Sequence, residues 1–320
     1  MKHCVVTGGA GFIGSHIVES LVNLGHSVRV VDDFSSGQLL NLHKVLGSDR
    51  VEVIEGSIVD ADLCKDIMKG QDYVFHHAAK VSVPESIENP QLYYEVNIQG
   101  TMNMLEACRL ENGFRRFINV GSSAAYGRCE IFPIKETQPV NTLSPYALTK
   151  YIQEMLCFTY SESYGLETIN LRYFNVYGER QNIDSPYAAV IPIFVVKHIR
   201  NQPLVVFGDG KQTRDFVHVS DVVRANLCAM NAKEAQGQVY NIAGGSTISV
   251  LDLVHLVGKV SGKEGVVEYR ESRKGEVLHS HASIEKAKRE LHWEPQCFLE
   301  EGVKNLWFWY QSRLDSVLQS

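Results

Sequence analysis

A tyrosine and a lysine stand four residues apart, at Tyr146 and Lys150, in a stretch with a helical pattern. That spacing places both side chains on one face of a helix. A free phenol has a pKa near ~10, too high for a base at neutral pH, and a nearby ammonium lowers it by stabilising the phenolate. The pair therefore predicts a tyrosine that takes and returns a proton in a reaction. Such pairs also occur in helices without catalytic function, so other motifs in the chain must show whether this pair is catalytic.

Two serines, Ser122 and Ser123, follow the apolar stretch 117–120. We expect that stretch to be a parallel strand, and ligands of α/β proteins bind at the carboxyl ends of such strands. A hydroxyl at this place can bind the same substrate oxygen as the tyrosine. On their own, two loop serines are better explained by bonds to local backbone groups.

A glycine-rich segment lies at residues 7–14, between the first predicted strand and the first predicted helix. Gly8 and Gly11 allow a tight turn and let the backbone approach a pyrophosphate, and Gly14 lets the helix pack close to the sheet. The start of the helix offers free N–H groups and a partial positive charge to phosphates. The segment predicts dinucleotide binding, and it lacks the Gly-Lys-Ser/Thr of a kinase or ATPase phosphate loop.

Two carboxylates, Asp32 and Asp33, end the second predicted strand, about 20 residues after the glycines. A carboxylate there accepts hydrogen bonds from the adenosine ribose hydroxyls and repels a 2′-phosphate. The predicted cofactor is therefore NAD rather than NADP.

Short apolar stretches alternate with longer helical patterns in the first half of the chain. Their apolar runs are continuous, as in strands that are covered on both faces of a parallel sheet. This alternation predicts an α/β fold with a Rossmann-type doubly wound parallel sheet. The predicted strands are residues 3–6, 27–31, 51–54, 73–75, 117–120 and 168–171, and the predicted helices are 12–24, 38–46, 63–68, 91–111 and 146–164.

The alternation loosens after about residue 174. We expect residues 1–174 to form an NAD-binding Rossmann domain and residues 175–320 a smaller mixed α/β lobe that binds the substrate, with parts of 213–242 returning to the first domain. Ser249 and Gly262 are typical of the start and the end of a helix. The cleft between the two parts is the expected ligand site. Further helices or strands are predicted at 187–200, 204–207, 219–230, 239–242 and 249–260.

Composition limits the class of protein. The 320 residues are 44% hydrophobic and 21% charged, with a net charge of −6 and no basic run, so nucleic acid and anionic membranes are not expected as partners. No apolar run approaches the ~18 residues of a membrane span, and no signal-peptide core opens the chain. The seven cysteines are scattered without a CxxC pair, which favours a cytoplasmic protein with neither a disulfide framework nor a metal site.

Taken together, these motifs resemble those of the extended short-chain dehydrogenases/reductases, and within them the nucleotide-sugar 4-epimerases. Further residues carry the resemblance: His-His-Ala-Ala at 76–79, Asn97, Leu-Arg-Tyr-Phe-Asn-Val-Tyr-Gly at 171–178, Phe-Gly-Asp-Gly at 207–210 and Arg-Asp-Phe at 214–216. The similarity extends from the first strand to about residue 293. It implies a retained NAD, a UDP-sugar substrate and a homodimer formed through helices 91–111 and 146–164.

The resemblance also implies a reaction. Tyr146 removes the proton of the sugar 4-hydroxyl while hydride passes from C4 to NAD. Lys150 lowers the pKa of the phenol and binds the nicotinamide ribose, and Ser122, with Ser123 beside it, shares the hydroxyl. The 4-keto sugar turns over about its diphosphate, and hydride returns to the opposite face, so that no net oxidation results.

The resemblance assigns a larger set of contacts to the two ligands. The implied cofactor contacts are Gly8, Gly11, Phe12, Ile13, Gly14, Asp32, Asp33, Ser36, Gly37, Ser57, Ile58, His77, Ala78, Ala79, Asn97, Tyr146, Lys150 and Tyr173. The implied substrate contacts are Ser82, Ser122, Tyr146, Asn175, Val190, Phe207, Arg214, Arg273, Glu276 and Ser280. Lys80 stands one place before the lysine of many glucose epimerases, and its role stays open between a phosphate contact and solvent exposure.

Other reactions on the same scaffold are weighed by the residues that they need. Related dehydratases carry an Asp-Glu pair beside the serine and UDP-glucuronate decarboxylases a glutamate, but residues 122–127 contain no acid. Uronate epimerases often carry an arginine near Asn182, so a UDP-glucuronate 4-epimerase is disfavoured and not excluded. A non-catalytic NAD sensor is disfavoured because the tyrosine, lysine and serine are all present.

The size of the sugar is inferred from Ser280. Glucose-only epimerases present a bulky tyrosine at this position, and a serine leaves room for an acetamido group. Residues 178–181 and 188–192 also resemble relatives that act on N-acetylhexosamines. We therefore expect interconversion of UDP-GlcNAc and UDP-GalNAc, with or without activity on UDP-Glc and UDP-Gal, unless Ser280 is an incidental small residue.

Overall fold

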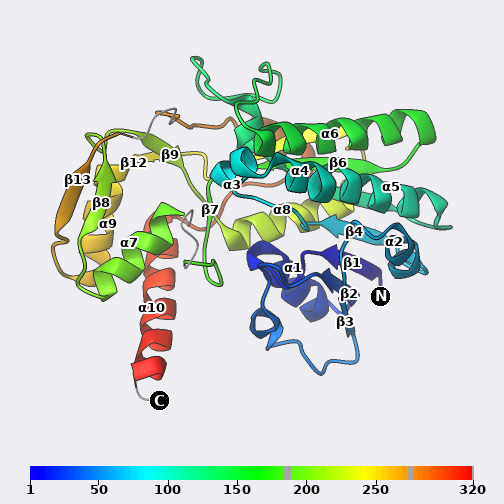
Figure 1. Cartoon of the computed structure of the whole chain (residues 1–320), viewed down its shortest axis with the longest axis horizontal. Helices are drawn as coiled ribbons and strands as arrows, with labels where there is room; N and C mark the ends of the chain where they lie inside the picture. Colours follow the sequence, from blue (N-terminus) through cyan, green and yellow to red (C-terminus); the bar gives the residue numbers. More distant parts are fainter. Residues whose placement is uncertain (184–188, 273–276, 319–320) are drawn as a thin grey trace.

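The computed structural model describes residues 1–183, 189–272 and 277–318. Its centre is a seven-stranded sheet in which all paired strands run parallel (Figure 1). Along the sheet the strands follow the order β11-β6-β5-β4-β1-β2-β3. They are β1 (His3–Thr7), β2 (Ser27–Asp32), β3 (Val51–Glu55), β4 (Tyr73–His76), β5 (Arg116–Ser122), β6 (Thr168–Tyr173) and β11 (Gln238–Ile242).

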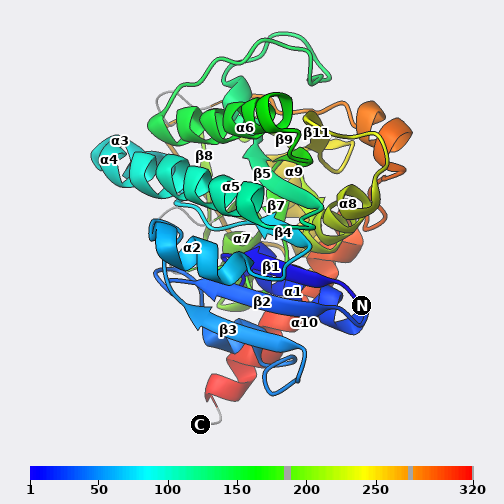
Figure 2. The same ribbon diagram turned by 90° about the vertical axis from the view of Figure 1, so that its right-hand side faces the viewer.

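Helices cover both faces of this sheet, which confirms the predicted α/β fold. One hydrophobic core lies where α1 (Phe12–Asn23) and α8 (Val219–Asn231) pack on the sheet, and a second lies under α2 (Ala61–Met68), α5 (Gly100–Leu110) and α6 (Pro145–Tyr164). Figure 2 shows α5 and α8 on opposite sides of the strands. Strands β4 and β6 are buried along their whole length, which explains their continuous apolar patterns. The first six predicted strands are confirmed to within two residues at each end.

The strand register gathers the carboxyl ends of the strands along one edge. Thr7 at the end of β1 pairs with Val31 of β2 and with His76 of β4. Farther along the sheet, Ser122 of β5 pairs with Tyr173 of β6. The loops that carry the predicted site residues therefore start from neighbouring points.

One predicted helix is interrupted. The stretch 91–111 consists of α4 (Pro90–Tyr93), a π-helical segment (Tyr94–Gln99) and α5. The wider turn contains Asn97, whose buried side chain bonds to Lys80 and Thr149 on other elements. Tertiary contacts therefore override the regular helical pattern, and π turns of this kind are frequent at functional sites.

A second predicted helix, 38–46, is wrong. The structure has only the 3₁₀ turn Leu39–Leu42 in this stretch. Leu39, Leu40 and Leu46 are exposed, so a full helix would bury little apolar surface, and such short helices are marginal without packing. The sequence analysis also missed α3 (Val83–Glu88) and α10 (Leu299–Leu318).

The smaller group of elements has its own core. α7 (Val190–Ile199), α9 (Val250–Ser261) and α10 pack together beside the parallel pair β8 (Leu204–Phe207) and β13 (Val267–Arg270). Figure 1 shows this group beside the main sheet, with the later turns of α10 (red) projecting from the rest of the molecule. The predicted ends of α9 are confirmed, because the Ser249 hydroxyl accepts from the amide of Asp252 and Gly262 closes the helix in the left-handed conformation.

Two short strand pairs lie between the two groups. β7 (Val176–Tyr177) runs parallel to β10 (Val217–His218), and β9 (Thr213–Asp215) runs antiparallel to β12 (Thr247–Ser249). These strands connect the main sheet to the pair β8 and β13. None of the described helices is long and apolar enough to cross a membrane.

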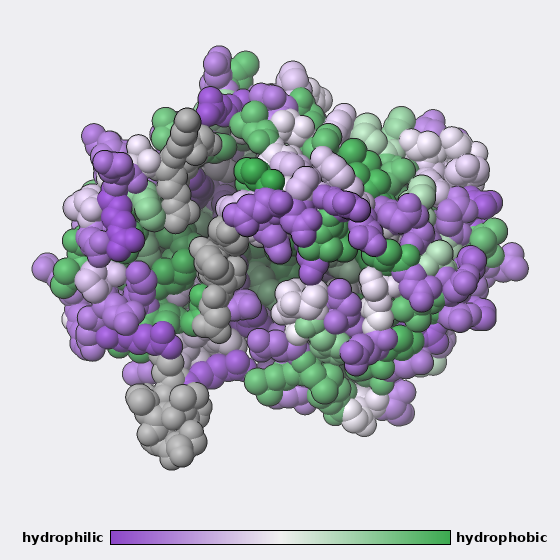
Figure 3. All heavy atoms as spheres, viewed as in Figure 1, coloured by the Kyte–Doolittle hydropathy of each residue, from purple (hydrophilic) through white to green (hydrophobic). Residues whose placement is uncertain are grey.

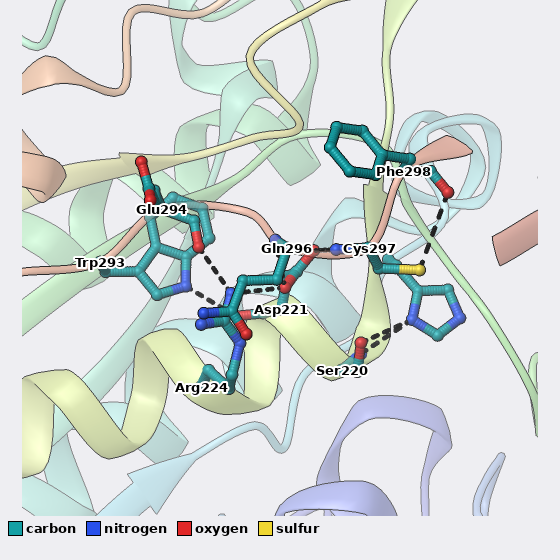
Figure 4. A network of polar contacts seen from close by, with 9 residues as sticks. Ser220, Asp221, Arg224, Trp293, Glu294, Gln296, Cys297 and Phe298 are labelled. Carbon is teal, nitrogen blue, oxygen red and sulfur yellow. Dashed lines mark hydrogen bonds and ion pairs between the residues drawn. The ribbon is translucent and has the colours of Figure 1, made fainter. Parts of the chain in front are cut away.

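The chain before α10 is fastened to α8 by a buried carboxylate. Figure 4 shows Asp221 of α8 beside the segment 293–298. Its carboxylate accepts the amides of Gln296 and Cys297, both at 3.0 Å, and binds Arg224 at 2.6 Å. The indole N–H of Trp293 donates to the Asp221 carbonyl at 2.9 Å. This network fixes where α10 begins.

Candidate active site

The glycine turn between β1 and α1 has no room for side chains. Gly8 has a φ of +65°, and a Cβ there would lie 2.7 Å from the amide nitrogen of Ala78. A Cβ on Gly14 would lie 2.2 Å from the carbonyl oxygen of Gly8. The turn therefore packs closely against the start of α1 and the loop after β4, and only glycine fits at these two positions.

The first turn of α1 offers unused donors at the same place. Its N-cap, Gly11, provides no side-chain cap, and the first turn contains no acidic residue. Among the described residues, no backbone acceptor takes the amides of Phe12, Ile13 and Gly14. Such amides, together with the helix dipole, favour a bound anion. These residues therefore fit the phosphates of a dinucleotide.

The two predicted carboxylates of β2 differ in their surroundings. Asp32 is buried, accepts the amides of Ala10 and Phe34 at 2.9 Å, and has its pKa raised by burial. A Cβ on Gly37 would lie 2.7 and 2.8 Å from its two oxygens, so only glycine fits beside it. Asp33 is exposed and binds Ser35. Asp32 is thus the carboxylate held in a fixed position beside the glycine turn, and the neighbouring Ser36 is exposed.

Lys80, whose role the sequence left open, reaches the loop after β2. Its ammonium donates to the hydroxyl of Ser35 at 3.0 Å, and that hydroxyl donates to Asp33 at 2.6 Å. Since β1 lies between β2 and β4 in the sheet, this contact joins the two loops on either side of the glycine turn.

Asn97 is committed to contacts within the protein. Its side chain accepts the amide of Lys80 at 2.8 Å and donates to the Lys80 carbonyl and to the Thr149 hydroxyl at 3.0 and 2.9 Å. The Thr149 hydroxyl in turn donates to the carbonyl of Tyr146. Asn97 therefore ties the loop after β4 to the first turns of α6, although the resemblance implied a cofactor contact.

His76 at the end of β4 is buried, and His77, which follows it, is partly buried. Burial and the charge of Lys150 lower the pKa of both to about 3. His76 lies between the hydroxyls of Thr7 and Thr101, at 3.0 and 2.9 Å. The ring of His77 contacts the hydroxyl of Tyr173 at 3.2 Å. His77 and the partly buried Ala78 and Ala79 therefore form a fixed wall beside the glycine turn.

Two other predicted cofactor contacts lie beyond the end of β3. The Ser57 hydroxyl accepts the amide of Val59 at 3.2 Å. Ile58 is buried, and a Cβ on Gly100 of α5 would lie 2.6 Å from its terminal methyl. Ile58 therefore packs against α5.

Tyr146 and Lys150 lie on one face of α6, and Ser122 contacts the phenol of Tyr146. α6 begins at Pro145 with the Ser144 hydroxyl as its cap, so Tyr146 lies in the first turn and Lys150 in the second. Ser122, at the end of β5, hydrogen-bonds to the phenol of Tyr146; that bond lowers the phenol pKa, while burial raises it and prevails. Ser123 follows in the 3₁₀ turn Ser123–Tyr126 and is partly buried.

Lys150 is an almost fully buried cation, with 3% of its surface exposed. Burial lowers the pKa of its ammonium to about 8, and the negative charge of Glu154 opposes this shift. None of the described side chains hydrogen-bonds to this ammonium. A buried donor group in this state suits a polar group of a bound ligand.

A cavity of about 210 Å³ lies between the main sheet and α7. Figure 3 shows the molecule hollowed between these two parts, with hydrophobic residues in the floor. Three of the predicted substrate contacts, Asn175, Val190 and Arg214, line this cavity. The Arg214 guanidinium donates to the carbonyls of Thr213 and Leu278 at 3.0 and 3.1 Å. Its positive charge at the wall suits a diphosphate.

The remaining predicted substrate contacts are more scattered. Phe207 ends β8 and pairs with Arg270 of β13. Ser280 is partly buried and is held by its amide, which donates to the Thr213 carbonyl at 3.1 Å. The Ser82 hydroxyl caps α3 by accepting the amide of Glu85. Arg273 and Glu276 lie outside the described residues.

Sequence reasoning missed the side chain that fixes the wall carrying Ser280. Asp215 is fully buried and accepts the amides of Gly244, Gly245 and Ala282 at 2.8, 3.1 and 3.1 Å. Burial raises its pKa to about 7, against these three bonds. The signal was present in the Arg-Asp-Phe motif at 214–216, of which only the arginine was assigned.

The fold and the site together define a dinucleotide-dependent enzyme of the Rossmann class. A model of the NAD dependent epimerase/dehydratase family matches residues 4–243. The chain belongs to this family, and its cofactor is NAD.

Several known proteins match this chain over nearly the whole length of both chains. A solved UDP-N-acetylglucosamine 4-epimerase from Methanobrevibacter ruminantium, in complex with UDP-N-acetylmuramic acid, is 36% identical with a TM-score of 0.93, covering 98% of this chain and 99% of that one. A solved UDP-glucose 4-epimerase from Thermotoga maritima, with UDP-glucose, is 38% identical with a TM-score of 0.92 and the same coverage. A UDP-glucose 4-epimerase from Mycolicibacterium smegmatis is 36% identical over 301 residues, 93% of this chain and 95% of that protein.

Other similar proteins are named for different reactions. A UDP-glucuronate 4-epimerase from Thermodesulfobacterium geofontis is 32% identical over 326 residues, 99% of this chain and 98% of that protein. A UDP-N-acetyl-alpha-D-glucosaminuronate decarboxylase from Bacillus cytotoxicus is also 32% identical, over 321 residues, 97% of this chain and 98% of that protein. The family is thus established, and the reaction has to be argued from the residues of the site.

The glycine turn gives a direct test of the cofactor site. Replacing Gly14 by alanine introduces a Cβ that overlaps the Gly8 carbonyl, and the resulting shift should weaken NAD binding about 10- to 100-fold, as overpacking costs about 1–3 kcal/mol. Titration calorimetry with NAD measures this. Gly25→Ala is the control, because a Cβ at Gly25 meets nothing within 4 Å; this variant should lose some stability and keep its NAD affinity. Wild-type NAD affinity in Gly14→Ala would contradict the assignment.

Proposed function

We propose that this protein interconverts the C4 epimers of a UDP-hexose through a transient 4-keto sugar. The observation that carries the proposal is the group formed by the partly buried Tyr146 and Ser122 and the buried Lys150 at the carboxyl edge of the sheet, next to a glycine turn that fits a dinucleotide. Asn175, Val190 and Arg214, which line the cavity at α7, would bind the UDP portion of the substrate. The other substrate contacts that the resemblance implies in the smaller lobe would complete this site.

The proposed roles follow from the chemistry of the side chains. Bound NAD supplies the acceptor and donor of hydride at the sugar C4. The phenolate of Tyr146 takes the proton of the 4-hydroxyl and later returns it, and the Ser122 hydroxyl orients the same sugar oxygen. Because the pKa of Lys150 is about 8, its ammonium is mostly charged at neutral pH and stabilises the phenolate. Arg214 would bind the diphosphate while the sugar turns over.

The competing reactions need groups that this site does not provide at the expected place. The turn after Ser122 contains alanines and a buried tyrosine and no carboxylic acid, so an elimination or a decarboxylation would lack an acid beside the serine. The UDP-glucuronate alternative stays open to experiment because it uses the same tyrosine, serine and lysine.

Product analysis distinguishes these activities. Incubation with UDP-Glc, UDP-GlcNAc and UDP-GlcA separately, followed by proton NMR, should give a 4-epimer with no release of water or carbon dioxide and no accumulation of NADH. Tyr146→Phe should lower the rate by about 10²- to 10⁴-fold, the usual contribution of a general base. Tyr164→Phe, at the exposed end of the same helix, should keep full activity. Full activity in Tyr146→Phe would instead support a non-catalytic NAD-binding protein.

We further propose that the sugar is an N-acetylhexosamine, with or without activity on glucose and galactose. Ser280 supports this, because its side chain is small and its amide donates to the Thr213 carbonyl, which also accepts a hydrogen bond from Arg214. Its segment is anchored from both sides, by Thr213 and by Asp215 through Ala282, so a larger side chain at 280 could not be accommodated by a simple shift of the wall.

A larger residue at position 280 should therefore change the choice of sugar. Ser280→Tyr is expected to reduce kcat/KM for UDP-GalNAc at least about tenfold, in line with the loss of a pocket contact, while kcat/KM for UDP-Gal changes little. Ser280→Ala, which keeps the space open, should leave the ratio of the two activities unchanged. An equal loss on both sugars in Ser280→Tyr would end the argument for a size gate.

We also propose a homodimer through the helices 91–111 and 146–164. Apolar side chains are exposed on both stretches, including Met155 and Phe158 on α6 and Tyr94 and Leu110 on the other. Exposed apolar side chains gathered on neighbouring helices are typical of subunit interfaces.

The oligomeric state tests this surface. Light scattering should give twice the monomer mass for the wild type and the monomer mass for the double variant Met155→Glu/Phe158→Glu, because two buried charges in the interface are costly. Val266→Glu, at an exposed position in the other part of the chain, should stay dimeric. A monomeric wild type would exclude this dimer.

A further inference from the structure

A buried ion pair lies one helical turn beyond Lys150. Glu154 is fully buried, and Arg172 of β6 is 4% exposed. The guanidinium of Arg172 donates to both carboxylate oxygens of Glu154, with its Nε at 2.9 and 3.0 Å and its terminal nitrogen at 2.6 Å. This is a forked pair with fixed geometry.

Neighbouring elements are shaped around the pair. Gly121 of β5 faces the carboxylate, and a Cβ there would lie 2.5 Å from its Oε1. The ring of Tyr126, from the turn that follows Ser122 and Ser123, stacks on the Arg172 guanidinium at 4.6 Å. The Tyr126 hydroxyl donates to Asn241 of β11 at 2.7 Å. The pair is therefore enclosed by α6, β5, β6 and β11.

Stability alone does not account for this arrangement. Taking a carboxylate and a guanidinium out of water costs several kcal/mol per ion, and well-packed apolar residues often replace such pairs without loss of stability. The position of the pair suggests another role. Tyr146, Lys150 and Glu154 follow each other at four-residue intervals along α6, which places them on one face of the helix.

We propose that Glu154, clamped by Arg172, is a positioning residue that keeps Lys150 charged. The inference rests on the proposed function, in which that charge stabilises the Tyr146 phenolate. The Lys150 ammonium is buried and would lose its proton readily. The fixed carboxylate four residues farther along the helix favours the charged form, and Arg172 prevents the carboxylate from turning away or taking up a proton itself.

The other titratable groups around Lys150 contribute little charge at neutral pH. His76 and His77 of β4 have pKa values lowered to about 3. Burial raises the pKa of Cys157 on α6 above its ordinary value and that of Tyr126 to about 12, so neither is ionised. Burial raises the pKa of Glu154, and the charges of Arg172 and Lys150 oppose that shift. The described surroundings of Lys150 thus contain one carboxylate and one further cation.

Two substitutions should move the pH dependence in the same direction. Glu154→Gln removes the negative charge, so Lys150 should lose its proton at lower pH and the alkaline limb of the rate profile should move down by about one unit. Arg172→Gln removes the cation that holds Glu154 ionised, so the buried carboxylate should take up a proton and the same limb should also move down. The phenolate absorbance of Tyr146, taken as the difference from the same variant with Tyr146→Phe, should appear at higher pH in Glu154→Gln.

The double variant Glu154→Gln/Arg172→Gln covers the case in which a single buried charge prevents folding. It keeps a side-chain hydrogen bond and removes both charges, and its alkaline limb should also move down because the carboxylate is nearer to Lys150 along the helix. A purely structural role would lower stability and rate while leaving both limbs where they are in the wild type, and that result would overturn the inference. Lys150→Met separates the two proposals: an active Lys150→Met enzyme contradicts the proposed function, whereas an inactive one combined with unmoved limbs contradicts only the role of Glu154.

Discussion

The site depends on a positive charge that is kept inside the protein. Lys150 is almost fully buried, and burial by itself favours the neutral amine. The phenol of Tyr146 is partly buried, and this burial likewise favours its protonated form. Each group alone would be inert at neutral pH. With the lysine one helical turn from the tyrosine and a carboxylate one turn beyond the lysine, the two groups can hold opposite charges.

The parallel sheet supplies the framework that holds these groups. Its register aligns the ends of β1, β2 and β4 and, farther along, those of β5 and β6. The loops that leave these ends are then fastened by buried polar side chains, among which His76 joins Thr7 to Thr101 and Asn97 joins Lys80 to Thr149. Such networks position residues strongly because every buried donor that loses its partner is costly.

Prediction from the sequence succeeded where the local backbone geometry requires a particular residue type. The glycine turn, Asp32 and the apolar strands followed from backbone sterics and from period alone, and Ser249 and Gly262 marked the ends of α9 for the same reason. It failed where the environment decides. Residues 38–46 have a helical pattern but too little surface to pack on, and 91–111 is broken by a π turn because Asn97 bonds to two distant elements. The ligand contacts of Asn97 and Ser82 implied by the resemblance stay predictions, and in the structure each side chain also bonds within the protein.

The sequence by itself determined the α/β fold, the glycine turn with its carboxylate, and the pairing of Tyr146 with Lys150, because each is encoded within a few residues or in one regular period. Only the tertiary structure decided which carboxylate is buried, that Ser122 contacts the phenol, that Lys80 reaches Ser35, and that Glu154 is held by Arg172 beneath Lys150. These contacts join residues from different strands and loops. Their energies depend on burial and mutual distance, which no local pattern in the chain contains.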